Sequence, residues 1–158
     1  MKLILLRGPS GTGKSTIAKH LVEKYNLDPN KNDVPAWVES DHFFTSVFGD
    51  GKYHFNIAKL KSAHQWAQLE AEHGMLIGLG LVIVSNTFIA HWEMERYLEL
   101  AEEYKYEVQI IRSPGPWTVE NSAKRNKHSV PLDVLKRHIN QYQPAEGEVE
   151  WTDLSIFK

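Results

Sequence analysis

Eight residues near the N-terminus have types and a spacing suited to holding a chain of phosphates. They read Gly8-Pro9-Ser10-Gly11-Thr12-Gly13-Lys14-Ser15 and fit the pattern G-x-x-x-x-G-K-[ST]. Glycines let a backbone take positive φ angles and wrap closely around phosphates. Successive N–H groups then form an anion nest at the positive end of a helix dipole. The segment therefore predicts a loop that binds ATP or GTP.

Individual side chains of this loop have separate expected roles. Lys14 supplies a cation for the β- and γ-phosphates, and the Ser15 hydroxyl is suited to ligating Mg²⁺. We expect ATP and Mg²⁺ as cofactors. The expected nucleotide contacts come from the loop and the turn after it: Gly8, Ser10, Gly11, Thr12, Gly13, Lys14, Ser15 and Thr16.

The elements around the loop predict an α/β fold. Apolar runs predict strands at residues 2–7, 36–40, 81–84 and 106–111, and helical spacing predicts helices at 14–25, 56–73, 91–104, 118–126 and 131–142. Residues 41–53 read as a loop. Alternating strands and helices predict a parallel sheet of four to five strands flanked by helices, as in P-loop NTPases, with a helical lid. Ligands then bind beyond the carboxyl ends of the strands.

Two charged residues outside the loop are candidates for catalysis. Asp41 follows the predicted strand at 36–40, where a carboxylate can take a proton from an attacking hydroxyl and help to hold Mg²⁺. The alternative role of Asp41 is to cap a helix or loop. Arg125 lies on a late helical segment and is suited to closing over the phosphates and the nucleotide, the alternative being a solvated basic face.

These residues and several further stretches resemble the phage-type polynucleotide 5′-hydroxyl kinases, within a wider group of small P-loop kinases that includes zeta-toxin-like proteins. Besides the loop, the resemblance rests on Ser40-Asp41-His42-Phe43-Phe44, Gly51-Lys52-Tyr53-His54-Phe55, Ala63-His64-Gln65-Trp66, Ser85-Asn86-Thr87, Trp92-Glu93-Met94, Pro116-Trp117 and residues 125–131. It covers about residues 1–142. The resemblance implies that Asp41 is the general base, that Arg125 is the lid arginine, and that a channel leads to the 5′-hydroxyl of DNA or RNA.

The chain departs from the pattern of these kinases at the end of the third strand. The family typically has an aspartate there, and this chain has Ser85. A serine cannot supply the negative charge that orients Mg²⁺ or its waters. Metal binding is then expected to rest on Ser15, Asp41 and the phosphates.

The acceptor side is expected to involve aromatic residues and polar residues that follow the strands. His42, Phe43 and Phe44 follow Asp41 directly in the sequence, where aromatic rings can stack on a base of the acceptor. Packing in the core is an equally suitable role for Phe43 and Phe44. His64 lies on the long helix, where core packing is the alternative role. Thr87 follows the third strand and completes the expected substrate contacts.

The sequence thus predicts an ATP-dependent kinase whose acceptor is the 5′-hydroxyl of a polynucleotide. Two other functions stay open. One is a kinase for a nucleoside, nucleotide or sugar, which the formal net charge of −2 favours slightly. The other is an ATP-binding module without catalysis, which Ser85 suggests. Oligomeric state is left open.

Composition sets the remaining expectations. The 158 residues suit one domain at 1–143 and a tail at 144–158 that packs back on it. The chain has no cysteine, which excludes disulfide partners and fits a cytoplasmic location. It has no apolar run of transmembrane length and starts with a predicted strand rather than a signal segment, so no membrane partner is expected.

Overall fold

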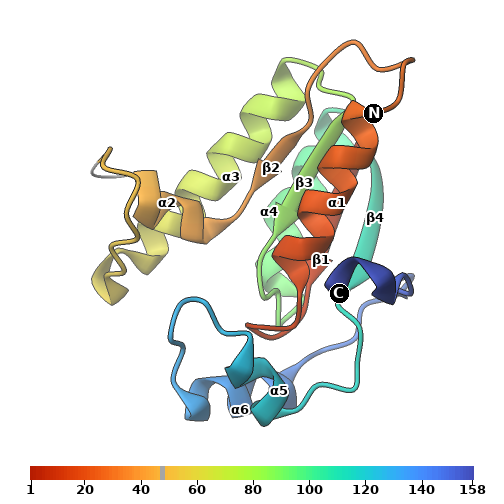
Figure 1. Ribbon diagram of the computed structural model, residues 1–158. Coiled ribbons are helices and arrows are strands. Elements are labelled where there is room, and N and C mark those ends of the chain that lie inside the picture. The colour runs from red at the N-terminus through yellow and green to blue at the C-terminus, as the bar shows by residue number, and fades with distance from the viewer. Residues whose placement is uncertain (47–48) are drawn as a thin grey trace.

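The computed structural model describes residues 1–46 and 49–158, and its centre is a parallel sheet with helices on both faces (Figure 1). The five strands lie in the order β2-β3-β1-β4-β5, and every neighbouring pair is parallel. This confirms the predicted α/β P-loop fold. The strands are β1 (Lys2–Arg7), β2 (Ala36–Val38), β3 (Leu81–Ser85), β4 (Glu107–Arg112) and β5 (Val149–Glu150).

The helices connect these strands and cover the sheet. They are α1 (Lys14–Asn26), α2 (Ser40–Ser46), η1 (Ile57–Lys59), α3 (Leu60–Leu76), α4 (Trp92–Glu103), α5 (Val119–Lys124), α6 (Leu132–Gln141) and η2 (Leu154–Phe157). In the described part of the chain, no helix combines the length and hydropathy needed to cross a membrane.

Two apolar clusters, one on each face, hold the helices to the sheet. Leu3 and Leu5 of β1 point into the cluster formed with α3 and α4, while Ile4 and Leu6 point into the cluster formed with α1. Successive side chains of a strand alternate between faces, so a strand covered on both sides needs an unbroken apolar run. The sequence of β1 meets this requirement, which explains why it predicted a buried central strand.

One predicted loop is partly helical. Ser40–Ser46 form α2, although residues 41–53 read as a loop; within that segment, Val47 and Phe48 lie outside the described residues. An acidic residue in the first turn, Asp41, favours a helix start, and Phe44 is only 1% exposed. Burial of Phe44 stabilises a helix that is too short to be recognised from its periodicity.

Residues of the C-terminal segment contact β4, α1 and the glycine-rich loop. β5 pairs with β4, and the ring of Phe157 lies against Gly13 in the loop itself. Trp151 meets His20 of α1 edge-on, with ring centroids 5.8 Å apart. Figure 1 shows η2, in dark blue, beside the start of α1.

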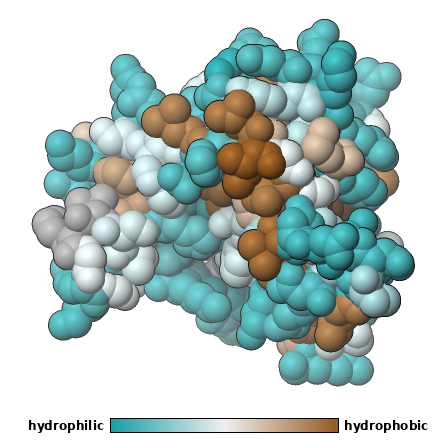
Figure 2. Space-filling model, turned by 90° about the horizontal axis from the view of Figure 1, so that it is seen from above, coloured by the Kyte–Doolittle hydropathy of each residue, from teal (hydrophilic) through white to brown (hydrophobic). Residues whose placement is uncertain are grey.

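The two ends of the sheet differ in chemistry. At the amino ends of the strands, turns and helix ends carry exposed apolar residues: Met1, Leu27, Val34, Leu76 and Ile77. Figure 2 views the molecule from this end and shows brown, hydrophobic surface among teal, hydrophilic surface. The glycine-rich loop leaves β1 at the opposite end, together with α2, α5 and α6. The polar residues predicted to be functional therefore gather at the carboxyl end of the sheet.

A buried arginine joins three distant segments at that end. Arg7, the last residue of β1, is 0% exposed, and its guanidinium donates to Phe88 O and to Glu148 Oε2 at 2.5 and 2.7 Å. The guanidinium also lies 4.3 Å from the centre of the Tyr142 ring. A charge this deeply buried requires a charged partner and full hydrogen bonding. Arg7 therefore fixes the β3–α4 loop and the C-terminal segment to the residue that precedes the glycine-rich loop.

We predict that Glu148→Ala lowers the free energy of unfolding by about 3–5 kcal/mol, because it leaves the Arg7 guanidinium buried without a counter-charge. Urea denaturation with an unchanged m-value measures this loss. Glu146→Ala is the matched control, since Glu146 is exposed two residues away and should change stability by less than about 0.5 kcal/mol. Equal effects of the two variants would contradict the role given to the buried pair.

Candidate active site

The glycine-rich loop has a preformed backbone between β1 and α1. Gly8, Gly11 and Gly13 have φ angles of 140°, 74° and 98°, which residues with a Cβ atom rarely adopt. The Gly8 N–H donates to Thr87 O at 3.0 Å, and the Thr12 hydroxyl donates to Pro9 O at 2.7 Å. The first bond joins the loop to the segment after β3, and the second stabilises the turn within the loop.

Lys14 lies across the mouth of this loop. Its Nζ donates to Gly8 O and Pro9 O at 2.9 and 2.8 Å. Burial lowers the pKa of Lys14 to about 8, and the negative charges of Glu39 and Asp41 oppose that shift. The ammonium group is thus held at the loop by two carbonyls, which it can exchange for phosphate oxygens, and the charges of two carboxylates act on it.

Glu39 is a site residue that the sequence analysis missed. It follows β2 directly, is only 8% exposed, and accepts a hydrogen bond from the Ser15 hydroxyl at 2.8 Å. Trp37 Nε1 donates to the same Oε1 at 3.2 Å, and His42 Nε2 lies 3.6 Å from Oε2. The feature of the sequence that could have identified Glu39 is a carboxylate at the end of a predicted strand. The adjacent Ser40-Asp41 offers a second carboxylate at the same place, and the sequence-based prediction names Asp41 instead.

Oxygen donors at this point fit a magnesium ion. The Ser15 hydroxyl and the Glu39 carboxylate are hard ligands of the kind that Mg²⁺ prefers, alongside waters and phosphates. Asp41, the other predicted metal ligand, makes its hydrogen bonds elsewhere. The carboxylate that the structure brings to Ser15 is therefore Glu39.

Asp41 lies in the first turn of α2 and is half-buried. The Tyr53 hydroxyl donates to its Oδ1 at 3.1 Å, and His128 Nε2 lies 3.5 Å from its Oδ2. Burial, together with the charge of Asp41, raises the pKa of Tyr53 well above its usual range. Asp41 is thus held between the segment after α2 and the segment after α5, and it acts electrostatically on Lys14.

Arg125 ends α5, the first helix of the predicted lid. Its guanidinium carbon lies 5.7 Å from the centre of the Phe157 ring, in a cation–π contact. The backbone of Ser122 and Asn126 passes directly over Gly11. The α5 segment and the C-terminal η2 therefore meet beside the glycine-rich loop, and Arg125 is exposed within reach of it.

The predicted acceptor residues divide between core and site. Phe44 packs edge-on among Phe43, Tyr53 and Phe55, so its burial fits the core role that the sequence left open. Phe43 also packs against Trp66 of α3, with ring centroids 6.2 Å apart.

The two histidines predicted to contact the acceptor, His42 and His64, lie at the junction of β2 and α2. His64 Nδ1 shares a 3.0 Å hydrogen bond with the Ser40 hydroxyl, and Ser40 N donates to Asn86 Oδ1 at 2.9 Å. His42 lies beside Glu39, as described above. His64 and Asn86 thus hold the start of α2, which carries Asp41.

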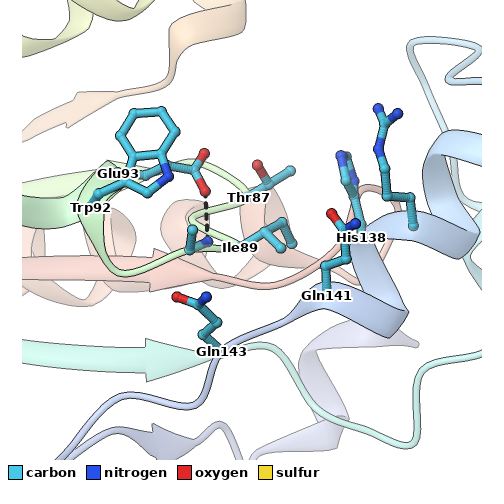
Figure 3. A pocket seen from close by; sticks show the side chains of 9 residues that line it. Thr87, Ile89, Trp92, Glu93, His138, Gln141 and Gln143 are labelled. Carbon is cyan, nitrogen blue, oxygen red and sulfur yellow. Dashed lines mark hydrogen bonds between the residues drawn. The ribbon is translucent and has the colours of Figure 1, made fainter.

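A cavity of about 660 Å³ opens beside Thr87, between the β3–α4 loop and α6. Figure 3 shows His138 and Gln141 projecting from α6 toward Thr87 and Ile89, with Trp92 on the other side. Trp92 is 70% exposed, and His138 Nδ1 is buried with no hydrogen-bond partner among the described residues. Burial and the charges of Lys14 and Arg137 lower the pKa of His138. The cavity combines an aromatic face, amides, the cationic Arg137 and the carboxylate of Glu93.

Known proteins with similar sequences include much longer ones. NEDD4-binding protein 2 from Homo sapiens is 33% identical over 146 residues, which cover 89% of this chain and 8% of that protein. The 2′,3′-cyclic-nucleotide 3′-phosphodiesterase from Pongo abelii is 22% identical over 140 residues, which cover 85% of this chain and 30% of that protein. The chain thus spans less than a third of the length of these curated relatives.

Solved structures share the fold at low sequence identity. A chain in the Pnkp1/Rnl/Hen1 RNA repair complex superposes with a TM-score of 0.66 and 20% identity, covering 97% of this chain and 50% of that one. The APS kinase CysC from Mycobacterium tuberculosis, in complex with AMPPNP and APS, superposes with a TM-score of 0.61 and 16% identity, covering 98% and 90%. The fold is therefore that of the small P-loop kinases.

A match over most of the sequence identifies the family of this chain. A family model described as an AAA domain matches residues 3–145, which run from β1 to the segment after α6. The match includes the glycine-rich loop, Glu39, Asp41 and Arg125. This chain therefore belongs to that AAA domain family.

Proposed function

We propose that this protein is an ATP-dependent kinase that transfers the γ-phosphate to the 5′-hydroxyl of a polynucleotide. The observation that carries the proposal is the position of Asp41. Its carboxylate is held by Tyr53 and His128, and it is near enough to the glycine-rich loop for its charge to act on the Lys14 ammonium. A carboxylate beside a phosphate-binding lysine is the arrangement that a hydroxyl acceptor needs.

Phosphate binding is assigned to the loop. The N–H groups at the start of α1 donate hydrogen bonds to the phosphate oxygens, and Lys14 exchanges its bonds with Gly8 and Pro9 for bonds to the β- and γ-phosphates. Bound Mg²⁺, held with the help of Ser15, would neutralise charge on those phosphates. Arg125 leaves the Phe157 ring and closes over the nucleotide and the transferring group.

Proton transfer is assigned to Asp41. The acceptor oxygen forms a bond to the γ-phosphorus while the bond between that phosphorus and the β–γ bridging oxygen breaks, which releases ADP. The hydroxyl proton passes to an Asp41 oxygen. Tyr53 and His128 are positioning residues, because their contacts orient the carboxylate. Most of the rate enhancement then comes from positioning and charge stabilisation.

Nucleic acid as the acceptor is supported by the cavity beside Thr87. Trp92 offers an exposed face for a base, Arg137 a cation for a backbone phosphate, and Gln141 an amide for a base edge. The likeness to a chain of an RNA repair complex points the same way. The second candidate is a small-molecule acceptor, which the cavity volume of about 660 Å³ and the likeness to APS kinase favour.

We predict that the affinity for ADP falls above pH 8. Phosphates bind the charged form of Lys14, and its pKa in the free protein is about 8, so binding above that pH requires proton uptake. The dissociation constant should rise up to tenfold per pH unit between about 8 and 9.5 and stay nearly flat from 7 to 7.5, as measured by calorimetry. Lys14→Met should bind weakly without this slope. A flat profile in the unmodified protein would rule out the assigned role of Lys14.

We also predict that Asp41→Asn lowers phosphoryl transfer by about 10²- to 10⁴-fold, because the hydroxyl loses its proton acceptor. The measurement is transfer of labelled γ-phosphate from ATP to 5′-hydroxyl oligonucleotides, with DNA and RNA in parallel. ADP binding should change less than about twofold. Asp28→Asn is the matched control, since Asp28 is a distant residue in the turn after α1.

The same assay separates the candidate functions. Label at the 5′-end that is lost in Asp41→Asn supports the polynucleotide kinase. Label only on nucleosides or small alcohols would replace it with the small-molecule kinase. ATP binding with no transfer to any acceptor would contradict both kinase functions.

A further inference from the structure

We propose that the acid that organises Mg²⁺ in the nucleotide complex comes from the end of β2, as Glu39, and not from the end of β3. The proposal rests on nucleotide binding by the glycine-rich loop and does not depend on the acceptor. In P-loop proteins the loop hydroxyl binds the metal and a nearby acid completes the arrangement. Here the acid in contact with the loop hydroxyl is Glu39.

The hydrogen bond between Ser15 and Glu39 is the first argument. The Ser15 hydroxyl donates to Glu39 Oε1 at 2.8 Å, so the hydroxyl and the carboxylate are adjacent without any ligand. Glu39 is 8% exposed, and a carboxylate this buried is retained only where charge and hydrogen bonds compensate for lost hydration. Trp37 and the Lys14 charge provide that compensation.

The end of β3 provides the second argument. Ser85, its last residue, is 3% exposed, and its hydroxyl makes no hydrogen bond within the described residues. β2 and β3 pair with Val38 opposite Val84, so Glu39 and Ser85 are the next residues along the two neighbouring strands. The acidic residue therefore lies at the end of β2 instead of at the end of the neighbouring strand β3, at the same level of the sheet.

Side-chain size makes this displacement possible. A glutamate is one methylene longer than an aspartate and can cross from β2 to the loop, and a serine on β3 leaves room beside it. Trp37 Nε1 then fixes the carboxylate from behind, which makes Trp37 a positioning residue for Glu39. An aspartate at position 85 would place a second negative charge next to Glu39, and the two would repel.

The test compares ADP binding with and without Mg²⁺ in three variants: Glu39→Gln, Ser85→Asp and the double variant. Calorimetry gives the ratio of the dissociation constants in EDTA and in Mg²⁺, and electron paramagnetic resonance of Mn²⁺ reports on the metal directly. In Glu39→Gln we expect the gain in affinity from Mg²⁺ to fall about 10- to 100-fold, whereas binding in EDTA should not weaken, because the lost carboxylate repels the phosphates.

The double variant makes the test specific. Restoring an acid on β3 in the Glu39→Gln background should recover at least part of the lost Mg²⁺ gain, whereas Ser85→Asp alone should bring no gain. Glu23→Gln, on the exposed side of α1, controls for the loss of a negative charge. Circular dichroism establishes that each variant is folded.

Several outcomes would overturn the proposal. An unchanged Mg²⁺ gain and unchanged Mn²⁺ affinity in Glu39→Gln would do so, as would a gain in affinity from Ser85→Asp alone. Absence of ADP binding by the unmodified protein would remove the nucleotide site and this proposal together. A lost Mg²⁺ gain in Glu39→Gln, without transfer to any acceptor, would support Glu39 while rejecting the kinase function, so the two proposals fail separately.

Discussion

The buried guanidinium of Arg7 is the constraint on which the other parts of this molecule depend. Arg7 lies at the point where β1 becomes the glycine-rich loop, and its donors are shared between the β3–α4 loop and the C-terminal segment. Phe88 and Glu148 are 81 and 141 residues away in the chain. Since a buried cation tolerates few arrangements of its partners, this residue fixes where the cavity wall and the tail lie relative to the loop.

The candidate site contains two carboxylates, Glu39 and Asp41, which both follow strand β2. Glu39 contacts Ser15, while Asp41, in the first turn of α2, contacts the segments after α2 and α5. The charges of both carboxylates act on Lys14. In the proposed mechanism, Glu39 serves the metal and Asp41 serves the acceptor hydroxyl, so neither carboxylate has to perform both tasks.

Segments that are distant in sequence contact one another beside the glycine-rich loop. Arg125 contacts the Phe157 ring, and Phe157 contacts Gly13, so the end of α5, the C-terminal turn and the loop form one continuous set of contacts. In the cavity beside Thr87, the buried His138 Nδ1 has no hydrogen-bond partner among the residues that the structure describes. A site built in this way can exchange weak internal contacts for ligand contacts at low cost.

The sequence by itself determined the glycine-rich loop, the strands and helices around it and the parallel sheet, because these follow from local backbone demands and from the period of apolar residues. It also identified Asp41 and Arg125 as candidates. Only the tertiary structure decided that Ser15 meets Glu39, that Arg7 meets Glu148 and that Phe157 meets Gly13. The physical reason is that side-chain encounters depend on strand order, register and side-chain length, and a local pattern contains none of these.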